Sequence, residues 1–267
     1  MKTSHTNPPR LALLLLLSIP TLSASRAALT PERERGPNWT GIVVLDNCDP
    51  KYKDKKKYAD NLTMLGPDGR QKFRLSGFNN CESIGSSRMI AADPARGCLW
   101  VIENVAQRVR RFNLKGEETL EIPNVHGSAL AVDPVTGNVW VLAGEGGIGK
   151  GHTVVYDPSG KKVAVHDIPG WDIAYDRKAK AFWIVDRNLT KITAATGKVV
   201  FSRNICVWCA SSIDVDPRRG VAWVAIRRHG QVDGSKNQLV RIGPDGKELT
   251  AVDLGRKSPS RVSAHPA

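Results

Sequence analysis

Short apolar runs alternate with clusters of turn-forming residues along most of this chain. Residues 129–133 form an apolar run, 134–137 carry Pro, Thr and Gly, and 138–143 are apolar again, a pattern that predicts a β-hairpin. A second hairpin is predicted over residues 153–168, around the turn sequence at 157–160. One unit of roughly 40 residues therefore predicts four strands.

The unit occurs four times with the same landmarks. An aspartate and a tryptophan recur in steps of 40, 43 and 40 residues, at Asp93, Asp133, Asp176 and Asp216 and at Trp100, Trp140, Trp183 and Trp223. A unit of this length cannot bury its own apolar face, so neighbouring units must cover one another. Four strands per unit predict an all-β fold, a β-propeller of four-stranded antiparallel blades.

The first blade is incomplete at its front. Residues 41–46 supply a second strand and residues 62–75 a third and fourth, but no first strand precedes them. The C-terminal segment 260–266 resembles residues 87–94 with one residue deleted, so we expect it to complete the first blade and close the ring. Five blades are detectable, and an open ring or a sixth, irregular blade is the alternative.

The N-terminus has the features of a secretory signal. Residues 1–27 combine Lys2 and Arg10 with an apolar run and then small residues, and the run is too short to span a membrane. We expect a linker over residues 28–40 and a propeller domain over residues 41–267. The predicted product is secreted or periplasmic, with no membrane span after signal cleavage.

The repeated motif itself resembles a known group of propellers. Most units read G-x-x-W-V, preceded by Ala-x-Asp-Pro and followed by a hairpin with Asp-x-x-Gly-Lys. Over residues 41–267 the chain resembles the NHL-repeat, gluconolactonase-like and virginiamycin-lyase-like propellers. The resemblance implies the fold more strongly than an activity, because these families include scaffolds, lactonases, lyases and polymer binders.

The meander pattern places the irregular segments together. Turns between first and second strands and between third and fourth strands lie at one end of a blade, which we call the turn face. The opposite end, the loop-rich face, receives the connections that vary in length, at 47–59, 77–87, 144–151, 204–210 and 227–237. Loops on one face of a rigid ring commonly carry binding residues, so we expect the ligand there.

Oxygen-bearing side chains follow several second strands on this face. The candidate metal ligands are Asp46, Glu103, Asn104 and Asp186. Such ligands suit a divalent cation such as calcium, and the gluconolactonase resemblance implies a metal-dependent lactonase or lyase as the alternative function. Blades three and five instead have Ala143 and Ile226, and Arg187 would compete with a cation beside Asp186. The competing interpretation is that these carboxylates order the loops that follow them.

Positive charge favours a different ligand. The net charge is +13, and removal of Lys2, Arg10 and Arg26 with the signal lowers it to +10. The candidate ligand-binding residues on the loop-rich face are Lys53, Lys55, Lys56, Glu103, Asn104, His126, Arg187, Arg227, Arg228 and His229. A positive lobe suits an anionic polymer, a glycan or a protein ligand, although a lysine run can also be a solvated loop. We therefore predict an exported binding or scaffold module, and no nucleic acid partner.

Five cysteines allow at most two disulfides in an exported protein. We predict the pairs Cys48–Cys81 and Cys206–Cys209, the second a Cys-x-x-Cys pair that could be redox active. Cys98 is predicted to be a buried free thiol. No catalytic residue is assigned, and the chain contains no Gly-x-Ser-x-Gly nucleophile motif.

Overall fold

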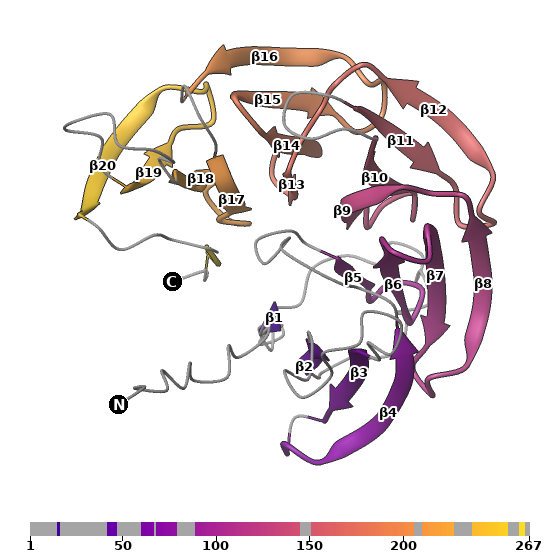
Figure 1. The fold of residues 1–267 in the computed structure, drawn as a ribbon. Helices are drawn as coiled ribbons and strands as arrows, with labels where there is room; N and C mark the ends of the chain where they lie inside the picture. The colour runs from indigo at the N-terminus through magenta and orange to yellow at the C-terminus, as the bar shows by residue number, and fades with distance from the viewer. Residues whose placement is uncertain are drawn as a thin grey trace, which may run out of the picture.

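The computed structural model describes residues 15–16, 42–46, 60–66, 68–78, 89–144, 151–205, 210–226, 237–255 and 262–264. These residues form five four-stranded antiparallel sheets and no helix. The sheets are arranged around a common axis like the blades of a propeller (Figure 1). The predicted all-β propeller with four-stranded blades is confirmed.

Each blade is a meander whose strands pair in chain order. Blade one contains β1 (Leu15–Leu16), β2 (Ile42–Asp46), β3 (Asp60–Leu65) and β4 (Gln71–Phe78). Blade two contains β5 (Ile90–Asp93), β6 (Cys98–Glu103), β7 (Arg108–Asn113) and β8 (Glu118–Pro123). Blade three contains β9 (Gly127–Val132), β10 (Val139–Ala143), β11 (His152–Tyr156) and β12 (Lys162–His166).

The last two blades repeat this order. Blade four contains β13 (Asp172–Asp176), β14 (Ala181–Val185), β15 (Asn188–Thr193) and β16 (Val199–Asn204). Blade five contains β17 (Ala210–Val215), β18 (Ala222–Ile226), β19 (Asn237–Ile242) and β20 (Glu248–Gly255). The first strands β5, β9, β13 and β17 contact one another in sequence, and the fourth strands lie at the periphery (Figure 1).

Burial decreases from the inner strands to the outer ones. Every residue of β6 and β14 is buried, whereas β12, β16 and β20 expose most of their side chains. Second strands lie between two other strands and between two blades, so their apolar residues are covered on both sides. This explains why the sequence reads as uninterrupted apolar runs there and as alternating runs in fourth strands.

The recurring aspartates close the hairpin turns. The Asp133 carboxylate accepts the backbone N–H of Val135 at 2.9 Å, and Asp176 accepts that of Ala179 at 3.0 Å. Asp216 accepts the N–H of Arg218 at 2.8 Å. A carboxylate at the end of each first strand thus satisfies donors that the tight turn leaves unpaired.

The recurring tryptophans fill the interior between blades. Trp100, Trp140 and Trp183 are at most 2% exposed. In blades two and four, a basic residue of the third strand lies over the indole ring, with Arg111 5.5 Å from the ring centre of Trp100 and Lys191 4.6 Å from that of Trp183. Each pair sits at directly opposed register positions of neighbouring strands. These cations therefore stabilise the blades through cation–π contacts.

The first blade differs from the sequence expectation. Its first strand is β1, which falls inside the predicted signal peptide and pairs with β2 through Leu15↔Val43 and Leu16↔Ile42. The C-terminal residues 262–264 lie against β17, where Val262 N–H donates to Ser212 Oγ at 3.3 Å and Ala264 N–H donates to Asp214 Oδ2 at 2.8 Å. An unpaired edge of β2 can pair with another strand, and the N-terminal apolar run supplies one in this structure. Ring closure by the C-terminal strand stays a prediction.

Candidate functional site

The sequence singled out residues expected to lie on the loop-rich face. Among these, Glu103, Asn104, His126, Asp186 and Arg187 belong to the part of the chain that the structure describes. Asp46 is the last residue of β2. The other predicted residues lie outside the described ranges, namely Lys53, Lys55, Lys56, Arg227, Arg228, His229 and the cysteines Cys48, Cys81, Cys206 and Cys209.

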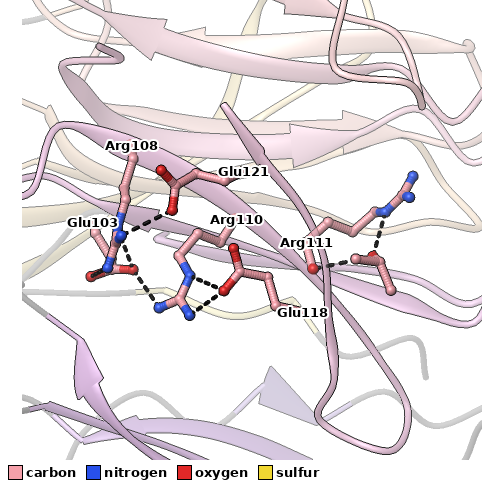
Figure 2. Close-up of polar contacts among 7 residues, drawn as sticks. Glu103, Arg108, Arg110, Arg111, Glu118 and Glu121 are labelled. Carbon is pink, nitrogen blue, oxygen red and sulfur yellow. Dashed lines mark hydrogen bonds and ion pairs between the residues drawn. The ribbon is translucent and has the colours of Figure 1, made fainter. Parts of the chain in front are cut away.

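Glu103 is the centre of a charged network at the end of β6 (Figure 2). Its side chain is fully buried. It accepts two hydrogen bonds from Arg108, Nε at 3.1 Å and Nη2 at 3.2 Å, and one from Arg110 Nη1 at 2.8 Å. Both arginines come from β7, the adjacent strand, where Arg108 lies directly opposite Glu103. A metal ion at Glu103 would have to compete with two guanidinium groups.

Two further carboxylates on β8 complete the network. Arg108 Nη1 lies 2.9 Å from Glu121, and Arg110 Nε lies 3.0 Å from Glu118. Burial by itself would lower the pKa of Arg110, but hydrogen bonds and charge from Glu118 and Glu103 raise it above its usual value. Arg110 therefore stays charged, and the three strands β6, β7 and β8 are linked by alternating charges.

Arg110 also connects two blades. Its guanidinium carbon lies 5.1 Å from the ring centre of Phe78 in β4 and 4.7 Å from that of Phe112 in β7. The two phenyl rings are 5.6 Å apart. A basic residue near the predicted ligand face is therefore part of the contact between blades one and two.

The remaining described candidates occupy turns at the same face. Asp186 is buried after β14, and its N–H donates to the carbonyl of Asn188 at 3.0 Å. Arg187 is exposed, while His126 is partly buried and its carbonyl accepts the N–H of Gly144 at 3.0 Å. Among the described residues, no group of three or more His, Cys, Asp or Glu side chains is arranged to hold a metal ion. The proposed metal ligands stay a prediction.

The sequence analysis missed a buried polar link between blades four and five. Asp172 at the start of β13 is fully buried and accepts Ser212 Oγ at 3.0 Å and Ile213 N–H at 3.0 Å, both from β17. Its other carboxylate oxygen accepts the N–H of Ile173 at 2.9 Å. The only sequence signal was a polar residue near the start of each of these two first strands, Asp172 in β13 and Ser212 in β17. With at least three donors around it, this carboxylate holds neighbouring blades together.

A pocket on the turn face was also missed. It has a volume of about 280 Å³ and is lined by Pro94, Ala95, Pro134, Val135, Tyr175, Arg177 and Lys180. These residues belong to the first hairpins of blades two, three and four, with Tyr175 in strand β13 and the others in the turns. Because the pocket requires turns from three blades, no single segment of the sequence indicates it.

Comparisons with known proteins support the fold alone. No model of a known protein family matches the chain, and a search of curated proteins finds no match. Among solved structures, hydrazine synthase of Kuenenia stuttgartiensis is similar to this chain with a TM-score of 0.59 at 13% identity, covering 88% of this chain and 70% of that one. In the described part of the present chain, no helix is long and apolar enough to cross a membrane. The chain is a β-propeller, and this fold by itself does not assign an activity.

Proposed function

We propose that this protein is exported and binds an anionic polymer, such as an acidic glycan, at its loop-rich face without transforming it. The observation that supports the proposal is that acidic and basic side chains are placed differently in the fold. Acidic side chains are drawn into the fold as turn caps at Asp133, Asp176 and Asp216 and in the ion pairs of Glu103. A net positive charge of +10 in the expected mature chain is then presented mainly at the surface.

The sequence shows where this positive charge is concentrated. Basic residues cluster in segments 51–57 and 227–229, which follow the second strands β2 and β18. Arg187, exposed after the second strand β14, adds a described basic side chain next to the same type of strand end. Several separated cations suit a repeating anionic chain better than a single small anion.

A metal-dependent lactonase or lyase is less well supported. One of the described carboxylates expected to act as ligands, Glu103, already faces Arg108 and Arg110. Neutralised carboxylates of this kind hold strands together, whereas a catalytic metal site keeps oxygen ligands and an open coordination position available.

The test is retention of the purified protein on heparin resin. We expect elution with rising salt, complete near 1 M, where the screening length is about 3 Å. A Lys53→Gln/Lys55→Gln/Lys56→Gln variant should elute at clearly lower salt. The matched control, Lys178→Gln/Arg218→Gln/Arg219→Gln, removes three exposed cations from the turn face and should elute like the wild type. Equal shifts in both variants, or no retention of the wild type, would contradict the proposal.

A further inference from the structure

We propose that the turn-face pocket is a second binding site, for a small aryl carboxylate. The site is independent of the proposed polymer binding, because it lies at the opposite end of the blades and uses different residues. Its volume of about 280 Å³ suits a compact ligand with one ring. Its lining combines apolar side chains with two cations, Arg177 and Lys180.

The apolar part of the pocket favours a flat ring. Pro94 and Pro134 each follow the aspartate of a hairpin turn. Tyr175 contributes an aromatic ring from β13 of blade four. The Tyr175 hydroxyl donates a hydrogen bond to Asp133, and burial first, then the Asp133 charge, raises the pKa of this phenol. The hydroxyl therefore stays protonated and holds the ring in one orientation beside the pocket.

The charge at the pocket favours an anion. Two of the nearby carboxylates have cationic partners, because Asp93 lies 3.1 Å from Arg96 and Asp176 lies 3.0 Å from Lys191. The third, Asp133, accepts hydrogen bonds from the Val135 N–H and the Thr136 hydroxyl. Within the described residues, no ion pair involves Arg177 or Lys180. A guanidinium group matches the two oxygens of a carboxylate, and an ammonium group beside it adds a point charge.

The backbone at Lys180 provides an independent indication. Lys180 has φ of 49°, in the left-handed region that residues other than glycine rarely adopt. The corresponding turns of blades two, three and five have glycine at this position, with φ of 59° at Gly97, 78° at Gly137 and 67° at Gly220. Three of these four turns line the pocket, and only the one in blade four carries a lysine at this position. A residue disfavoured by its backbone conformation and placed at a pocket points to a function for its side chain.

The experiment titrates phenylacetate into the full protein by calorimetry. We expect weak but saturable binding, with 2-phenylethanol, which keeps the ring and lacks the charge, and acetate, which lacks the ring, each binding at least about tenfold more weakly. Arg177→Gln and Lys180→Gly should each lose about tenfold in affinity. Lys178→Gln, in the same turn but outside the pocket lining, is the matched control and should bind like the wild type.

The Lys180→Gly variant separates binding from folding. It restores the glycine that the other turns use, so its melting temperature should equal or exceed that of the wild type while its affinity falls. Added heparin should leave phenylacetate binding unchanged, since the two sites are separate. Absence of phenylacetate binding to the wild type, unchanged affinity in Lys180→Gly, or an equal loss in Lys178→Gln would overturn the proposal.

Discussion

The Lys191 ammonium lies 3.0 Å from Asp176 Oδ2, and the two side chains are 5% and 0% exposed. The same carboxylate oxygen accepts the indole N–H of Trp183 at 3.1 Å, and Lys191 lies over the Trp183 ring. The aspartate and tryptophan of one repeat are thereby joined to its third strand. In this repeat, the spacing of seven residues places the indole N–H within hydrogen-bond distance of the carboxylate.

Replacing Lys191 with Met is expected to destabilise the protein strongly. The substitution leaves the Asp176 charge buried without its cation, which typically costs about 3–5 kcal/mol in the free energy of unfolding. Urea denaturation measures the loss. Arg241→Met is the matched control, because it removes a less buried cation from Trp223 and should cost about 0.5–1 kcal/mol. Equal effects of the two variants would show that the buried pair adds nothing.

The Glu103→Gln variant is expected to lower the free energy of unfolding by about 1.5–3 kcal/mol. It keeps the shape of the side chain but removes the charge that Arg108 and Arg110 face. Glu118→Gln, which changes a partly exposed partner of Arg110, should cost no more than about 1 kcal/mol. Denaturant titration of both variants provides the comparison, and a larger loss at Glu118 would be contrary to this interpretation.

Calcium is expected to leave the melting temperature unchanged, because the Glu103 carboxylate is held by two arginines. Thermal unfolding with calcium and with a chelator measures this directly. Specific binding to the folded state would raise the melting temperature, and the rise would continue with the logarithm of the free calcium concentration above Kd. A calcium-dependent rise that disappears in Glu103→Gln would favour the metal-dependent alternative.

Stability is expected to fall as the pH drops below about 6.5, through His166. Its imidazole stacks on Trp140 at 5.0 Å, and burial lowers its pKa from the usual 6.5. Between the two pKa values the unfolded chain binds more protons, so acid favours unfolding. Denaturation above and below pH 6.5 should show a smaller pH dependence for His166→Phe than for the wild type. An identical slope in both proteins would rule out this contribution.

Cys98 is expected to resist alkylation in the folded protein. It is a buried free thiol, as the sequence predicted, and burial together with the Asp93 charge raises its pKa to about 11. The reactive thiolate is therefore scarce at neutral pH. Peptide mass spectrometry after iodoacetamide treatment should find Cys98 modified slowly in native protein and rapidly in denaturant. Native labelling at the denatured rate would show that the thiol is accessible.

The sequence alone determined the blades. Hairpin periodicity is a local property, so strand order and turn positions follow from alternating apolar and turn-forming residues, and the structure confirms them in blades two to five. The first strand of blade one, β1, was not predicted. Glu103 was also recognised as a notable position from its place after an apolar strand. Its partners were not, because Arg108 and Arg110 gain their roles only through register with β6 and through contact with Phe78 of another blade.

The tertiary structure decided which residues meet across blades. Asp172 is joined to Ser212, 40 residues away, and the turn-face pocket combines Pro94, Pro134 and Lys180 from three repeats. Such contacts depend on how the sheets are packed around the axis, and this packing is set by side chains distributed over the whole chain. A periodic sequence specifies each blade locally, while the chemistry between blades appears only when the ring brings equivalent positions together.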